Sequence, residues 1–347
     1  MPEPHNNILK KVKIGLLSEF PAPIIYGGLE MQCVRTFGAL QQTGLDVSLV
    51  DYYVPEQKID ILHIFGNPPS MYEICVSASK TKKIVISTVF GGAQISRPLS
   101  FGIKTLSSML ELAGQKIDHT RVRVMLELAS HIISLNEIER DFIIERYNID
   151  PRKITIIANG IDDFYFNVSA EPFIKKYQIR DYVLFTGNIN PRKNPLRLAL
   201  ALNKLNAKGV FIGKTVATEL AYAQEFEKVI NSSLNLLWIQ GLSNKDPLLP
   251  SAYKASAVFC LPSFAEGQSC SVLEAMASAK PAIMADRPYA YQDGFEHSLK
   301  CDPSSVDSIS EAIKEVLKHS EKYSYQLPDN YNWHNVANAI IEVYKKL

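Results

Sequence analysis

The chain has 347 residues, a length that favours two domains over a single hydrophobic core. Apolar residues make up 46% and charged residues 21%, as in soluble globular proteins, a composition that indicates neither disorder nor low complexity. Lys and Arg number 37 against 36 Asp and Glu, so bulk charge does not favour a nucleic-acid-binding protein.

The cysteines and the apolar runs indicate the cellular compartment of the protein. Five cysteines, an odd number without metal-ligand spacing, predict reduced thiols and a cytoplasmic protein: Cys33, Cys75, Cys260, Cys270 and Cys301. The N-terminal apolar run, IGLL, is too short for a signal peptide, and no later run is long enough to span a bilayer. Peripheral contact with the inner face of a membrane stays open, because an amphipathic surface needs no long apolar run.

Short apolar runs alternate with helical patterns in the first part of the chain. The strand-like runs are VKIGLL, DVSLVDY, DILHIF, KKIVISTV, HIISL and KITIIA, and a helix is predicted over 29–42. This alternation predicts βα units and a parallel sheet. Segment 158–166, ANGIDDFYF, breaks the pattern with the turn signal Asn159-Gly160 and is the predicted linker.

A second series follows the linker. Its strand-like runs are YVLFTG, KGVFIG, LNLLWIQG, ASAVFCLP and KPAIMA, with helices predicted over 195–207 and 217–230. The sequence therefore predicts an α/β protein with two doubly wound domains, residues 1–160 and 166–330.

The last segment is a helical pattern, predicted over 331–347. One face of this pattern is apolar and consists of Val336, Ile340, Val343 and Tyr344. Because the second series is complete before it, we expect this helix to pack back on the first domain.

The stretch LPSFAEGQSCSVLEAMASAKP, residues 261–281, predicts a strand, a turn and a helix. Glu266 lies in the turn and Glu274 about two helical turns later, roughly 12 Å along the axis. In an open parallel sheet, ligands bind at such turns. We expect free N–H groups where the helix begins, at Gly267, Gln268 and Ser269, to favour an anion or sugar hydroxyls. A helix cap at Glu266 and a solvated helix residue at Glu274 are the alternatives.

The loop GNINPRKNP carries two cations. Gly187 ends a predicted strand and Pro195 begins a helix, so Arg192 and Lys193 lie where a diphosphate would bind. A solvated basic loop is the alternative. In the first domain, Gly28 precedes a helix and opens a loop to a diphosphate or an acceptor.

Four segments resemble the retaining glycosyltransferases of family 4, which have the GT-B architecture. AEGQSCSVLEAMA is similar to their E-x7-E signature, and VLFTGNINPRKNPLRL to their phosphate-binding segment. YGGLEMQCVRTFGALQQTG resembles their first glycine-rich loop and helix, and IIANGIDDFYF their interdomain signature. The resemblance implies two Rossmann-like domains facing across a cleft, the first for the acceptor and the second for the donor.

The resemblance also implies roles for individual residues. Glu266 would be the catalytic residue that orients the transferred sugar, and Glu274 would accept hydrogen bonds from the ribose of the donor. Lys193 matches the family's lysine, whereas Asn188 stands where the family has arginine, a charge that Arg192 would replace. Relatives carry a histidine where this chain has Phe90-Gly91-Gly92, and His63, within a strand, fits a structural role.

The function implied is transfer, with retention, of a sugar from a nucleotide-diphosphate sugar to a glycan or lipid-linked acceptor in polysaccharide or glycoconjugate assembly. The chain has no Asp-x-Asp triplet and no apparent carboxylate cluster for Mg²⁺, so we expect neither a metal nor a further cofactor. The alternatives are a noncatalytic nucleotide-sugar-binding protein and a GT-B sugar-nucleotide epimerase or phosphorylase.

Overall fold

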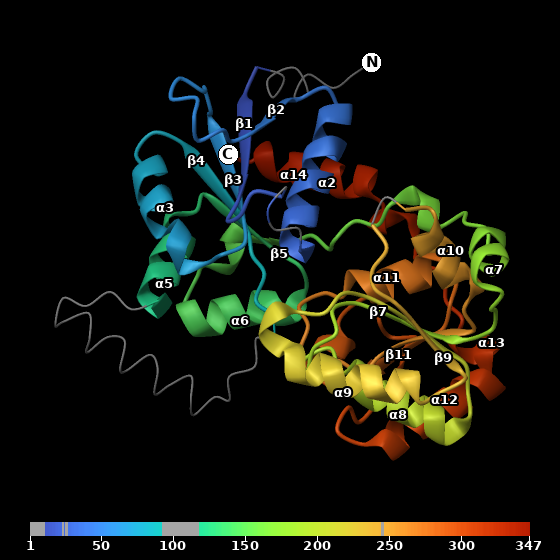
Figure 1. Cartoon of the computed structure of the whole chain (residues 1–347). Coiled ribbons are helices and arrows are strands. Elements are labelled where there is room, and N and C mark those ends of the chain that lie inside the picture. The colour runs from blue at the N-terminus through green and yellow to red at the C-terminus, as the bar shows by residue number, and fades with distance from the viewer. Residues whose placement is uncertain (1–10, 23, 25–26, 92–117, 244–245) are drawn as a thin grey trace. The chain divides into compact units, whose positions relative to one another are not determined.

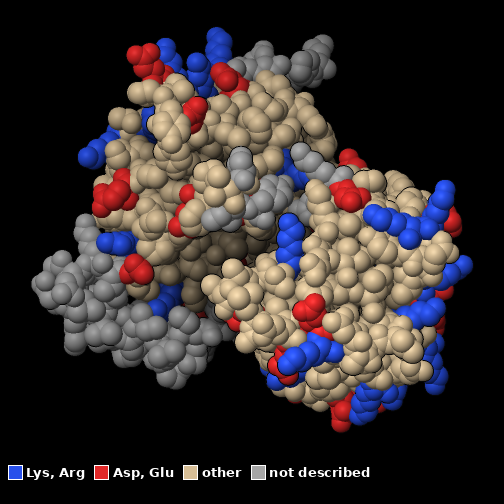
Figure 2. All heavy atoms as spheres, in the orientation of Figure 1, with Lys and Arg blue, Asp and Glu red and all other residues tan. Residues whose placement is uncertain are grey.

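The structure is a computed structural model that describes residues 11–22, 24, 27–91, 118–243 and 246–347 (Figure 1). The chain forms two compact units, residues 1–160 with 330–347, and residues 161–329. Figure 2 shows acidic and basic side chains interspersed on the drawn face of each unit, in keeping with a formal net charge of +1.

The first unit is built on a parallel sheet of six strands in the order β2-β1-β3-β4-β5-β6. The strands are β1 (Lys13–Ser18), β2 (Asp46–Leu49), β3 (Ile61–Phe65), β4 (Lys83–Ser87), β5 (His131–Ser134) and β6 (Ile154–Ile156). The helices are α2 (Gly28–Gln42), α3 (Tyr72–Ala78), α5 (Asp118–Leu128), α6 (Glu137–Tyr147) and α14 (Trp333–Tyr344).

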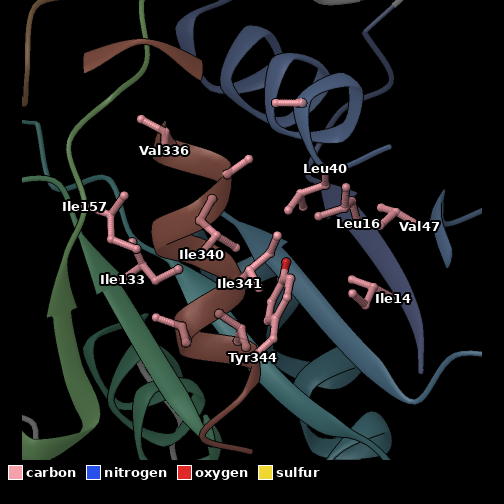
Figure 3. Close-up of a cluster of buried hydrophobic side chains, with 14 of the residues drawn as sticks. Ile14, Leu16, Leu40, Val47, Ile133, Ile157, Val336, Ile340, Ile341 and Tyr344 are labelled. Carbon is pink, nitrogen blue, oxygen red and sulfur yellow. The ribbon is translucent and has the colours of Figure 1, made fainter. Parts of the chain in front are cut away.

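The C-terminal helix α14 belongs to this first unit. Val336, Ile340 and Ile341 pack against the apolar face of the sheet and against Leu40 of α2, as Figure 3 shows. The opposite face of the sheet has its own apolar cluster, to which α3, α5 and α6 contribute. Both faces of the sheet are therefore covered by helices, which explains why its strands read as nearly continuous apolar runs.

His63 is an internal structural link in this unit. Its Nδ1 lies 2.6 Å from the Tyr344 hydroxyl and its Nε2 lies 2.8 Å from Oγ of Ser87, so the ring connects β3, β4 and α14. Burial lowers the pKa of His63 to about 3, which keeps the ring neutral. This geometry agrees with the structural role expected from its position within a strand.

The second unit repeats the architecture with a parallel sheet of six strands in the order β12-β11-β10-β7-β8-β9. The strands are β7 (Val183–Thr186), β8 (Gly209–Ile212), β9 (Leu236–Ile239), β10 (Val258–Leu261), β11 (Ala282–Ala285) and β12 (Leu299–Cys301). The helices are α7 (Glu171–Tyr177), α8 (Pro195–Leu205), α9 (Leu220–Asn231), α10 (Leu248–Ala255), α11 (Cys270–Ala277), α12 (Val306–Lys318) and α13 (Ser320–Tyr323).

The two sheets confirm the predicted doubly wound α/β class. Edge strand β12 was not predicted, because three residues with Lys300 in the middle carry too little apolar pattern. In the described residues, no helix is both long and apolar enough to cross a membrane.

Candidate active site

Two loops meet at the carboxyl edge of the second sheet. Strands β7 and β10 are neighbours, so the loops that follow them, 187–194 and 262–269, leave the sheet side by side. The backbone N–H of Phe264 donates to the Arg192 carbonyl at 2.8 Å, and Nη1 of Arg192 donates to the Ala265 carbonyl at 2.6 Å. The structure thus brings the basic segment and the Glu266 turn into direct contact.

Glu266 is the centre of a compact ionic cluster. Nζ of Lys193 lies 2.7 Å and Nη1 of Arg192 3.1 Å from its Oε1, and the Ser263 hydroxyl donates to the same oxygen at 2.6 Å. The Glu266 side chain is 9% exposed and that of Lys193 14%, whereas that of Arg192 is half exposed. Burial alone would raise the pKa of Glu266, but the two cations and the hydrogen bonds outweigh it and hold this pKa below its ordinary value. The cluster therefore contains an ionised, nearly buried carboxylate.

Glycine at two positions allows this cluster to form. Gly187 has φ of 143°, and a Cβ placed on it would lie 3.6 Å from the stem of Lys193. Gly213 begins the turn after β8, residues 213–215, which we call the GKT turn. A Cβ on Gly213 would lie 1.8 Å from the Gly187 carbonyl oxygen, too close for any residue other than glycine. The neighbouring amide of Ile189 donates to the Lys214 carbonyl at 2.9 Å. The basic loop and the GKT turn are therefore packed backbone to backbone.

Asn194 fixes the other end of the basic loop. It has a left-handed backbone, with φ of 62°, and its buried amide donates to the carbonyls of Pro262 and Pro303 at 3.1 and 2.8 Å. The loop after β7 is thereby joined to the loops after β10 and β12. Sequence reasoning missed this residue, although an Asn directly before a helix-starting proline is a signal for such a position.

Glu274 lies in a separate hydrogen-bond chain of the same unit. The Tyr253 hydroxyl donates to its Oε2 at 2.6 Å and lies 2.5 Å from Oγ1 of Thr186 at the end of β7. Burial raises the pKa of Glu274 to about 7, although hydrogen bonds from Tyr253 and Tyr165 act in the opposite direction. Glu274 therefore has the partners that a buried carboxylate needs, and it changes charge near neutral pH.

The structure corrects the position at which the helix after Glu266 begins. Helix α11 starts at Cys270 with Ser269 as its N-cap, so Gly267 and Gln268 precede the helix. The Gly267 carbonyl accepts a hydrogen bond from Nε2 of Gln292 at 2.9 Å, and both Gln268 and Ser269 are buried. The expected separation of roughly 12 Å between Glu266 and Glu274 assumed a continuous helix between them, whereas only the part from Cys270 onward is helical.

Gly28 is the first residue of α2, in the first unit. Among the described residues, no atom lies within 4 Å of a Cβ placed there, so these residues leave the Gly28 backbone open to approach. The adjacent Gly27 N–H already donates to a carboxylate oxygen of Glu30 at 3.0 Å, however. A side-chain anion therefore occupies part of this helix start, and the role of Gly28 in donor binding stays a prediction.

Phe90 stands in the loop where the resemblance implied a histidine. Its ring packs 5.1 Å from that of Phe142 and 5.7 Å from that of Tyr147, between centroids. Its amide donates to Oε1 of Glu139 at 2.7 Å, and the other oxygen of this buried carboxylate accepts from the amide of Leu135. Gly92 lies outside the described residues.

Two family models match the chain. The model described as glycosyl transferases group 1 matches residues 170–345, just over half of the chain, and the model described as glycosyltransferase family 4 matches residues 47–163.

Two relatives from Escherichia coli match over part of their length. A UDP-Gal:alpha-D-GlcNAc-diphosphoundecaprenol alpha-1,3-galactosyltransferase of Escherichia coli is 27% identical over 69% of this chain and 61% of its own. The O-antigen chain mannosyltransferase B of Escherichia coli is 25% identical over 64% of this chain and 62% of its own. The chain thus spans about three fifths of the length of these two relatives.

Solved structures resemble nearly the whole chain. Anabaena HepE, crystallised with UDP and glucose, has a TM-score of 0.72 at 15% identity and covers 97% of this chain and 100% of its own. Sucrose-phosphate synthase from Thermosynechococcus elongatus has a TM-score of 0.74 at 14% identity, covering 97% and 99%. These likenesses show a shared GT-B fold.

Proposed function

Because the chain belongs to the family of glycosyl transferases group 1, we propose that it transfers a sugar, with retention, from a nucleotide-diphosphate sugar to a glycan or lipid-linked acceptor. The observation that carries the proposal is the cluster of Glu266, Lys193 and Arg192 at the carboxyl edge of a parallel sheet. Ligands of open α/β sheets bind at this edge, and the cluster combines cations for a diphosphate with a carboxylate for sugar hydroxyls.

In the proposed reaction, the diphosphate of the donor takes positions next to Lys193 and Arg192. Negative charge develops on this leaving group as the bond to the sugar breaks, and fixed cations stabilise it most where water is excluded. Glu266 accepts hydrogen bonds from sugar hydroxyls beside the reacting carbon. With no assigned enzyme nucleophile, the acceptor attacks the same face of the sugar from which the diphosphate leaves, and the diphosphate takes the acceptor's proton.

Glu274 is proposed to bind the ribose of the donor. A carboxylate can accept a hydrogen bond from each of two neighbouring hydroxyls, and the Tyr253 hydroxyl fixes one of its oxygens at 2.6 Å. This role requires the ionised form, so donor binding is coupled to proton release from Glu274.

The names of two relatives support a glycan or lipid-linked acceptor. The galactosyltransferase relative acts, by its name, on a sugar linked to diphosphoundecaprenol, and another is named for the O-antigen chain. A lipid-linked acceptor would bring the protein to the inner face of a membrane. The exposed side chains of Tyr52 and Tyr53, 60% and 93% accessible, are of the type that enters a bilayer interface.

Donor hydrolysis and thermal shifts test the proposal. Purified protein is incubated with a panel of nucleotide sugars, and the melting temperature should rise with the true donor, because a ligand that binds only the native state stabilises it. Slow release of free sugar from that donor distinguishes a transferase from a noncatalytic binding protein. A stabilising nucleotide sugar that is never hydrolysed or transferred would favour the binding protein, an alternative supported by the packed Phe90.

A further inference from the structure

The two carboxylate oxygens of Glu266 have different surroundings. Oε1 is the oxygen that contacts the Lys193 ammonium, the Arg192 guanidinium and the Ser263 hydroxyl. All three contacts converge on this one oxygen. One oxygen is therefore an anchor, and the other is left to accept from a sugar hydroxyl.

Two of the three anchoring groups are the cations that the proposed function assigns to the diphosphate. When a diphosphate binds, their charge is shared with its oxygens and their hold on Glu266 weakens. Ser263 differs, because the residue is fully buried and its carbonyl accepts from the Tyr289 hydroxyl at 2.8 Å. Its hydroxyl is therefore not exposed to a ligand.

We propose that Ser263 is a positioning residue that keeps Oε1 of Glu266 in place once donor diphosphate has engaged Lys193 and Arg192, so that Oε2 stays directed at the sugar. This inference rests on the proposed function. It assigns Ser263 no contact with substrate, and it makes the Ser263 hydroxyl the one anchor that is independent of the ligand.

The competing role for Ser263 is to hold the loop together. Its Oγ also lies 3.0 Å from the Arg192 carbonyl and 3.2 Å from the Ala265 carbonyl. A hydroxyl has a single proton, however, and the ionised carboxylate at 2.6 Å is the nearest and strongest acceptor. The Arg192 carbonyl already accepts from the Phe264 amide, and that of Ala265 from the Arg192 guanidinium. Removal of the hydroxyl therefore leaves neither carbonyl unpaired.

The test compares Ser263→Ala and Ser263→Cys with Ser310→Ala. Ser310 is a buried serine on α12 whose hydroxyl bonds the backbone carbonyls of Ala201 and Val306. We expect Ser263→Ala to lower kcat roughly tenfold, as for loss of one hydrogen bond to a charged group, with the Kd for UDP or GDP and the Tm near those of wild type. The acid limb of the kcat profile should move to higher pH. Ser263→Cys should recover part of kcat, and Ser310→Ala should leave all four readouts unchanged.

Two results would overturn the inference. An unchanged kcat in Ser263→Ala would show that the cations alone position Glu266, and a parallel loss of nucleotide affinity and Tm would assign Ser263 to the loop. A measurement that does not depend on turnover distinguishes failure of this inference from failure of the proposed function. With glutamate labelled at the δ carbon and its Glu266 signal identified by Glu266→Gln, Ser263→Ala should raise the pKa of Glu266 in the UDP-bound protein, and an unchanged pKa contradicts the inference even if no sugar is ever transferred.

Discussion

Lys193 and Glu266 form an ion pair of 2.7 Å between two side chains that are both nearly buried. Each ion compensates the buried charge of the other, so removal of either one would leave an unpaired buried charge. The same pairing means that an arriving diphosphate competes with Glu266 for the Lys193 ammonium.

The first prediction follows from this competition. Glu266→Gln keeps the shape of the side chain but removes its charge, so turnover should fall roughly 100-fold or more, as for loss of a group that acts in the transition state. The Kd for the nucleoside diphosphate should stay the same or fall, because the cations no longer have an internal anion. Steady-state kinetics and calorimetry with the same preparation measure both. Equal turnover in the variant and wild type would remove Glu266 from the catalytic role.

The second prediction concerns Arg192, whose guanidinium is half exposed and lies 3.1 Å from Glu266. If it replaces the arginine expected at Asn188, Arg192→Ala should weaken nucleoside diphosphate binding about tenfold, the equivalent of ~1.4 kcal/mol. Asn188 is exposed, so Asn188→Arg fits and should recover part of the affinity in the Arg192→Ala background. An unchanged Kd in Arg192→Ala would leave Lys193 as the cation of this site.

The third prediction is a pH dependence set by Glu274, whose pKa burial raises to about 7. If only the ionised form accepts the ribose hydroxyls, the fraction able to bind falls about tenfold between pH 8 and pH 6. Nucleoside diphosphate binding should weaken by that factor as pH falls. Glu274→Gln should bind more weakly at pH 8 and show a flatter profile. Identical pH profiles for the variant and wild type would assign the titration to another group, such as the phosphate.

The parts of this site that could be predicted from sequence are those whose signal is local. Glu266, Arg192 and Lys193 each lie in a turn between an apolar run and a helix, so their place at the carboxyl edge of a parallel sheet follows from the alternation of elements. The start of α11 was misplaced, because Gly267 was taken as the first helical residue. Ser269, a preferred N-cap type, was the better signal.

The parts that could not be predicted depend on contacts between distant segments. Tyr253 lies in α10 and reads as an ordinary core residue, yet its hydroxyl reaches Glu274 and Thr186, which are 21 and 67 positions away in the chain. Ser263 reads as the end of a strand, and only the fold directs its hydroxyl at Glu266 rather than at a backbone group. Asn194 likewise has its two carbonyl partners 68 and 109 positions away.

The fourth prediction uses Cys270 as a probe of the site. It is the partly exposed member of the five free cysteines, and the other four are buried. Burial, and then the charge of Glu274, raises its pKa to about 12, so labelling by a small thiol reagent should be slow but selective. Bound nucleotide should slow it further. Peptide mapping after timed labelling, with Cys270→Ser as control, measures the rate, and equal rates with and without a nucleotide shown to bind would mean that the ligand lies elsewhere.

The last prediction is that transfer needs no divalent metal. Charge that develops on the leaving diphosphate must be met by a cation, either a bound metal or fixed protein groups. Lys193 and Arg192 already lie at the proposed position of the diphosphate, on loops fixed by Asn194 and by the Gly187–Gly213 packing. Over residues 11–22, 24, 27–91, 118–243 and 246–347, no three His, Cys, Asp or Glu side chains gather as metal ligands would.

Transfer assayed in excess EDTA should therefore proceed at nearly the rate measured with added Mg²⁺. Lys193→Ala is the matched variant, because it removes the fixed charge and should lose most of its activity. A partial gain of activity by this variant with Mg²⁺ would show that a metal can replace the lysine but is not needed by the wild type. Activity of the wild type that EDTA abolishes and Mg²⁺ or Mn²⁺ restores would contradict the prediction, because the fixed cations would then be insufficient for the departing diphosphate.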